Sequence, residues 1–110
     1  MDDTRDAYEA YLRGQELLAA HEYRQATVAL ERAKALEPEK GSIREALGRA
    51  YLSSRAYRNA ASEFAKAVEL APTDGYAHYG LARALDRLGE RRMAARHYKL
   101  ARVFGSPASA

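Results

Sequence analysis

Apolar residues recur at steps of three and four along most of the chain, the spacing that places them on one face of an α-helix. In the middle of the sequence this pattern predicts a helix over residues 43–53, with Leu47 and Tyr51 on its apolar face. A second predicted helix covers residues 57–70, and Pro72 ends it. No segment alternates between apolar and polar residues with a period of two, so the pattern predicts an all-α protein without strands.

The sequence also repeats every 34 residues, as the step from Gly14 to Gly48 illustrates. Two series of alanines and one series of large apolar residues keep this step through three copies: Ala26, Ala60 and Ala94; Ala33, Ala67 and Ala101; Leu30, Phe64 and Tyr98. We therefore expect one domain that consists of an acidic lead-in and three repeat units, at residues 1–6, 7–40, 41–74 and 75–108.

The small residues of the repeat predict how its two helices pack. Helices approach closely only where side chains are small, so Gly14 should face Ala26 in the first unit, and Gly48 should face Ala60 in the second. The large apolar residue of each unit then fills the adjoining space. Because one such hairpin buries too little surface to be stable alone, three stacked units are about the minimum.

These landmarks resemble the tetratricopeptide repeat (TPR), which combines Leu-Gly, Tyr, Ala, Phe, Ala and Pro at fixed spacing. The second unit carries the pattern most fully, with Arg44 where the family has tryptophan, through Leu47, Gly48, Tyr51, Ala60, Phe64, Ala67 and Pro72. The resemblance covers residues 7–108 and implies a right-handed superhelix of three stacked antiparallel helix-turn-helix repeats. It also implies a scaffold that binds other proteins in a concave groove lined by the first helices.

Tyrosine and arginine dominate the surface on which this groove is expected, and both are enriched at binding hot spots. The candidate groove residues are Tyr8, Tyr11, Gln15, Glu45, Arg49, Tyr76, Tyr79, Arg83 and Arg87. An extended or helical peptide with apolar and acidic side chains would fit them best. The alternative is structural: the first two tyrosines cap the N-terminal end, and Arg83 and Arg87 pair with Asp86 or Glu90.

Some members of the family clamp the C-terminal carboxylate of chaperones with lysine, asparagine and arginine side chains. The corresponding positions in this chain are Tyr11, Gln15, Ala46, Tyr76 and Gly80. None of these residues is basic, so we do not expect a chaperone tail as the partner.

The predicted last helix is apolar at positions that are polar in the earlier units. Met93, Leu100, Val103 and Phe104 are candidates for self-association or for contact with a partner, and a homodimer would follow from the former. Two alternatives are that the helix end folds back to cover these residues within the chain, or that the tail is truncated.

Charge changes from acidic to basic along the chain: residues 1–6 carry a net charge of −2 and residues 75–110 a net charge of +5. The basic end leaves open a third function, an accessory module for nucleic acid, although no nucleic-acid motif supports it. There is no apolar run that could span a membrane, and the acidic start does not fit a signal peptide, so we expect a cytoplasmic protein without membrane contact.

The residues that usually carry catalysis or metal binding are scattered. The chain has no cysteine, and His21, His78 and His97 have neither a histidine four residues away nor the carboxylate spacing of a helical zinc site. We expect His78 to be a packed residue in the tryptophan-like position. The seven glycines form no phosphate-binding loop. The sequence therefore predicts neither an enzyme nor a metal or cofactor site.

Overall fold

The computed structural model describes residues 3–106 and contains six α-helices within that range, without a strand. The ends of the predicted lead-in and of the third unit, residues 1–2 and 107–108, lie outside the described residues. The helices are α1 (Asp3–Ala19), α2 (Tyr23–Leu36), α3 (Gly41–Ser53), α4 (Tyr57–Leu70), α5 (Gly75–Arg87) and α6 (Arg91–Val103). The predicted all-α class is confirmed, and α4 has the bounds that the periodicity gave.

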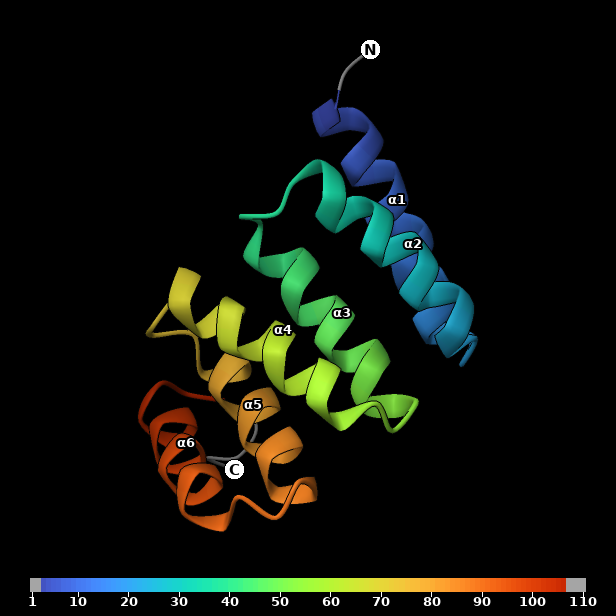
Figure 1. Cartoon of the computed structure of the whole chain (residues 1–110). Helices are drawn as coiled ribbons and strands as arrows, with labels where there is room; N and C mark the ends of the chain where they lie inside the picture. Colours follow the sequence, from blue (N-terminus) through green and yellow to red (C-terminus); the bar gives the residue numbers. More distant parts are fainter. Residues whose placement is uncertain (1–2, 107–110) are drawn as a thin grey trace.

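Each consecutive pair of helices forms a hairpin, and the three hairpins follow one another along a molecule of 44 × 25 × 22 Å (Figure 1). The pairs α1/α2 and α5/α6 lie at opposite ends, with α3/α4 between them. Two first helices begin earlier than the pattern suggested: α3 starts at Gly41 instead of residue 43, and α1 starts at Asp3, within the predicted lead-in.

The turn inside each hairpin repeats with the same 34-residue step. His21, Arg55 and Gly89 occupy equivalent positions, and all three have a positive φ, of 61°, 67° and 83° respectively. The residue after each of these three donates its backbone N–H to the carbonyl five residues earlier, as in the 2.8 Å bond from Ala56 N to Tyr51 O. This bond closes the C-terminus of the first helix, so the turn requires a left-handed residue, which glycine alone adopts without steric cost.

Glycine and large apolar residues interlock in the core, as expected from the repeat. A Cβ atom on Gly14 would lie 2.5 Å from the side chain of Leu30, and one on Gly48 would lie 2.7 Å from the ring of Phe64. Ala26 and Ala60, which the sequence placed opposite these glycines, are fully buried. The small residues therefore allow each hairpin to close around its one large side chain.

A buried carboxylate joins the first two repeats, which the sequence did not predict. Glu63 of α4 is 6% exposed, and its two oxygens lie 2.9 Å from Lys34 Nζ in α2 and 3.0 Å from Arg44 Nη1 in α3. Lys34 also pairs with Glu31 at 2.9 Å. Arg44 holds the position of the family's tryptophan, so a salt bridge replaces an aromatic packing contact at this junction.

The end of α6 folds back toward α5, the alternative that the sequence had left open. The ring of Phe104 stacks on that of His78 with 5.7 Å between their centroids. Ser106 is 3% exposed, and its amide nitrogen would lie 2.9 Å from a Cβ atom on Gly75, at the start of α5. Leu100 is half-buried, whereas Met93, Val103 and Phe104 remain exposed. The fold-back therefore leaves three of the four predicted self-association residues accessible.

Candidate functional site

Five of the predicted groove residues line a single hollow of about 260 Å³ between α3 and α5. We name it the arginine hollow, and its lining residues are Glu45, Arg49, Leu52, Phe64, Tyr76, Tyr79, Gly80 and Arg83. Arg49 and Arg83 are one repeat apart in sequence, so the stacking of the repeats brings their equivalent positions together. The arrangement combines two guanidinium groups with tyrosine rings above an apolar base.

A second hollow of about 210 Å³ shares the lining residues Arg83 and Leu52 with the arginine hollow. Here the guanidinium of Arg87 lies 5.0 Å from the centre of the Tyr57 ring, a cation–π distance. The guanidinium of Arg83 lies 5.8 Å from the Tyr79 ring in the same way. Each of these two guanidinium groups therefore lies over a tyrosine ring while its side chain remains exposed.

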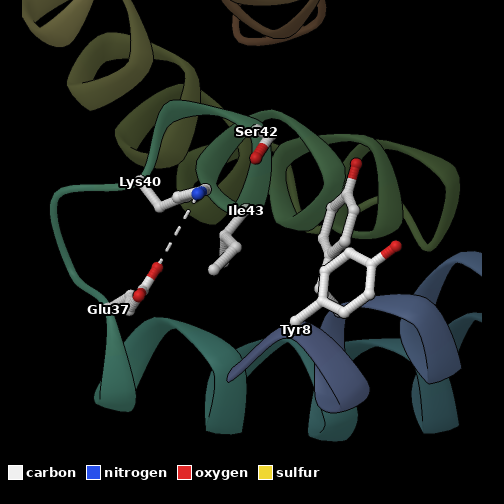
Figure 2. A pocket seen from close by; sticks show the side chains of 6 residues that line it. Tyr8, Glu37, Lys40, Ser42 and Ile43 are labelled. Atoms are coloured by element: carbon white, nitrogen blue, oxygen red, sulfur yellow. Dashed lines mark ion pairs between the residues drawn. The ribbon is translucent and has the colours of Figure 1, made fainter. Parts of the chain in front are cut away.

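The other predicted groove residues lie apart from these hollows. Tyr8 and Tyr11 of α1 line a smaller space of about 130 Å³, the tyrosine hollow, together with Glu37, Lys40, Ser42 and Ile43 (Figure 2). Figure 2 shows the Ile43 side chain between Tyr8 on one side and the Lys40–Glu37 ion pair on the other. Gln15 contacts its neighbour Tyr11, whose hydroxyl oxygen accepts a hydrogen bond of 2.8 Å from Nε2.

The carboxyl group of Glu45, which lines the arginine hollow, has an unusually high pKa. Burial raises its pKa to about 8, and a hydrogen bond and the negative charge of Asp74 act in the same direction, while Arg49 opposes them. Asp74 itself caps α5, since its Oδ1 accepts from the amide of Tyr76 at 3.0 Å. The raised pKa therefore reduces the negative charge that Glu45 presents to Arg49 at neutral pH.

The sequence did not predict that aromatic residues of the second helices also line these hollows. Tyr57 and Tyr98 line the hollow beside Arg87, and Tyr23 lines another hollow of about 260 Å³ that Arg49 and Arg83 share. Tyr23 and Tyr57 are 34 residues apart, so the repeat itself carried this signal. The expectation that only first helices form the surface left these residues out.

Arg83 and Arg87 show no ion pair with Asp86 or Glu90 in the described structure, contrary to the structural alternative for these arginines. Within residues 3–106, no group of three or more potential ligands is arranged to hold a metal ion. None of the six helices in that range combines the length and apolarity needed to cross a membrane. His78 is 3% exposed and packed, as predicted from its place in the repeat.

Comparison with solved structures identifies the architecture. The structure is similar to the Arabidopsis OM64 TPR domain, with a TM-score of 0.92 and 15% sequence identity over 94% of this chain and 86% of that one. The chain has the tetratricopeptide-repeat fold. The second TPR of Spaghetti (RPAP3), solved bound to an HSP90 peptide SRMEEVD, gives a TM-score of 0.88 and 19% identity over 92% of this chain and 94% of that chain.

A third TPR structure, the Sgt2 domain from Aspergillus fumigatus, gives a TM-score of 0.87 and 21% identity over 93% of this chain and 70% of that chain. No protein-family model and no curated protein sequence matches the chain. The TPR assignment therefore comes from the arrangement of the helices, together with the repeat landmarks that the core uses.

Proposed function

We propose that this TPR chain is a non-catalytic protein-interaction module that binds a peptide or helix of a partner protein in the arginine hollow. The observation that carries the proposal is the position of Arg49 and Arg83, which face the same hollow beside Tyr76 and Tyr79. Both arginines are exposed, and neither forms an ion pair with another described residue. Two guanidinium groups without a carboxylate partner favour an acidic ligand.

The chemistry of the hollow supports a ligand that has apolar as well as acidic side chains. Leu52 and Phe64 provide apolar surface at its base, and the tyrosines offer large contact areas with few torsions to immobilise. The similar Spaghetti domain was solved with the peptide SRMEEVD, which contains three acidic residues. The proposal does not extend to chaperone tails, because the positions of the family's basic clamp are Tyr11, Gln15, Ala46, Tyr76 and Gly80 here.

An array of synthetic peptides tests this function by the chemical class of the ligand. Peptides that combine acidic and apolar residues are compared with basic and with uncharged sequences, and dissociation constants of the strongest binders are then measured in solution. We expect Arg49→Glu and Arg83→Glu each to weaken binding by at least about tenfold, since each reverses a charge inside the hollow.

Arg58→Glu is the matched control, because Arg58 is an exposed arginine of α4 outside the lining of the arginine hollow. It changes the net charge of the protein by the same amount and should leave binding within about twofold of the wild type. Equal loss in all three variants would show that net charge, and not the hollow, attracts the peptides. Absence of any preference for acidic peptides would overturn the proposed ligand class.

Self-assembly through the last helix is a second candidate function, favoured by the exposure of two apolar side chains on α6. Val103 is 66% exposed and Met93 is 48% exposed. Sedimentation at increasing concentration tests it, with Val103→Glu as the disrupting variant. A strict monomer at high concentration would remove this candidate.

Nucleic-acid binding is the third candidate, and α6 again supplies its one supporting observation. The helix carries five basic residues and no acidic one, and all five are exposed: Arg91, Arg92, Arg96, Lys99 and Arg102. Retention on heparin at graded salt tests it, because phosphate contacts weaken steeply as salt rises. Elution at low salt would remove this candidate.

A further inference from the structure

The second and third repeats each have a pair of contacting side chains at equivalent positions, and the two pairs differ chemically. In the second repeat, Arg44 of α3 contacts Glu63 of α4 at 3.0 Å, and its Nε donates to the carbonyl of Pro38 at 2.9 Å. One repeat length later, at a step of 34 residues, stand His78, His97 and Pro72. The third repeat thus has two imidazole rings where the second repeat has an arginine–glutamate ion pair.

The contacts around the two imidazoles fix where their protons lie. His78 Nε2 is 2.7 Å from the Pro72 carbonyl oxygen, which only accepts, so Nε2 carries a hydrogen. The Nδ1 atoms of His78 and His97 are 3.0 Å apart, a hydrogen bond that needs one proton between the two nitrogens. In the neutral pair, His97 donates through Nδ1 and His78 accepts. Protonation of both rings would place two N–H groups of like charge against each other.

The surroundings of the pair oppose that protonation. His78 is 3% exposed and lies beneath the ring of Phe104. Burial lowers the pKa of His97, and the neighbouring His78 and the positive charge of Arg96 lower it further. Lys34 of α2 contacts the Arg44–Glu63 pair of the second repeat, and its equivalent one repeat later is Val68 of α4. At this position α4 therefore has an uncharged residue. No carboxylate among the described residues forms an ion pair with either ring.

Helix α6 also has the fewest buried residues of the six described helices. It packs against α5 and no other described helix, and only two of its residues are fully buried, Ala94 and Ala101. The other five helices each bury at least three residues. A helix with so few buried contacts opens at low cost, and the loss of one hydrogen-bonded pair has a large effect on it.

We infer that the His78–His97 pair is a pH-sensitive latch that holds α6 on α5 at neutral pH and releases it in mild acid. The sign follows from proton linkage. The pKa of His97 is lowered in the folded chain, so in mild acid the unfolded chain binds a proton that folded His97 lacks, and stability is lost as pH falls below about 6.5. Each excluded proton changes the opening equilibrium by up to about tenfold per pH unit.

Release of α6 would also change the surface beside the arginine hollow. Tyr98 of α6 contacts Tyr79 with 6.0 Å between ring centroids, and it lines the hollow that contains Arg83 and Arg87. If the proposed function is correct, on which this consequence alone depends, peptide affinity falls together with the attachment of α6. The latch itself is tested without any ligand.

Hydrogen exchange of the whole chain measures the latch directly. Protection of α6 amides, corrected for the intrinsic pH dependence of exchange, is compared between about pH 7 and pH 5.5 in the presence of a chelator. We expect protection in α6 to fall roughly tenfold, while protection in α3 and α4 changes less. In the double variant His78→Arg/His97→Glu, which recreates the pair of the second repeat, α6 protection should be independent of pH in this range.

Two further variants test the latch even if the double variant does not fold. His97→Gln retains a side-chain donor for His78 Nδ1 and does not titrate, so it should reduce the pH dependence even if the double variant fails to fold. His21→Asn removes the exposed histidine of the first turn and should leave the pH dependence of α6 as in the wild type. Unchanged α6 protection at both pH values in the wild type would overturn the inference. So would a dependence that appears only without chelator, because a metal ion would then join the rings.

Discussion

Phe64 lies against Gly80 of the following repeat so closely that a Cβ atom on Gly80 would be 2.2 Å from Cε1 of the ring. On the other side of the ring lies Gly48 of the same repeat, where a Cβ atom would be 2.7 Å from Cε2. Phe64 is therefore held between two glycines, and it joins the second repeat to the third.

Gly80→Ala should destabilise the protein because the added methyl group has no free volume to occupy. The ring cannot retreat, since Gly48 limits it from behind, and overpacking of this kind costs about 1–3 kcal/mol. Urea unfolding followed by circular dichroism measures the change. Gly41→Ala is the control, because nothing lies within 4 Å of a Cβ atom there, and it should change stability by less than about 0.5 kcal/mol.

Arg55→Gly should stabilise the protein, although it removes a side chain. Arg55 has φ of 67°, a conformation that costs a residue with a Cβ atom about 1–2 kcal/mol, whereas glycine adopts it freely. Part of this gain is offset by the greater entropy of glycine in the unfolded chain, so we expect about 0.5–1 kcal/mol. The same substitution at Arg32, an exposed residue in the interior of α2, should instead destabilise by about 1 kcal/mol. A decrease in stability for Arg55→Gly would contradict the turn geometry.

Glu63→Gln should destabilise the junction of the first and second repeats. The substitution leaves Lys34 and Arg44 without their shared carboxylate, in a position where Glu63 is 6% exposed. Removal of one partner from a buried ion pair costs about 3 kcal/mol. Glu16→Gln breaks an exposed pair with Arg13 and should cost less than about 1 kcal/mol. If thermal unfolding showed a similar loss of stability for Glu63→Gln and Glu16→Gln, the stabilising role of the buried Glu63 ion pairs would be contradicted.

Glu45 should make the protein less stable as pH rises. Its pKa is about 8 in the folded chain against an ordinary value of 4.5, so between these values the folded state binds a proton that the unfolded state has lost. Stability therefore falls as pH increases through this range, in the opposite direction to the effect of the histidine pair. Glu45→Gln should remove that slope in unfolding experiments at about pH 5, 6.5 and 8, whereas the exposed control Glu69→Gln should not.

The repeat landmarks predicted most of the fold because they report local packing. Gly14, Gly48 and the alanines of the core keep their spacing because each lies at a contact inside its own hairpin, so periodicity revealed both the helices and their pairing. The role of Gly80 was missed, because it faces the phenylalanine of the preceding repeat and not a residue in its own hairpin.

The candidate site was predicted only in part for a related reason. The helical periodicity placed Arg49, Tyr79 and Arg83 on one predicted surface, and these residues do line one hollow. Tyr8 and Tyr11 share that face in projection but lie in the separate tyrosine hollow. A helical wheel fixes the direction of a side chain, whereas the distance between helices decides which side chains share a space.

By itself, the sequence determined the helices, the 34-residue hairpin and the identity of the residues that close each hairpin, since these depend on contacts between near neighbours in the chain. Only the tertiary structure decided that Glu63 is buried between two cations, that Phe64 lies between two glycines, and that the Nδ1 atoms of His78 and His97 lie 3.0 Å apart. Those relations join separate helices, and their geometry depends on how the hairpins stack, which the spacing of residues along the chain does not encode.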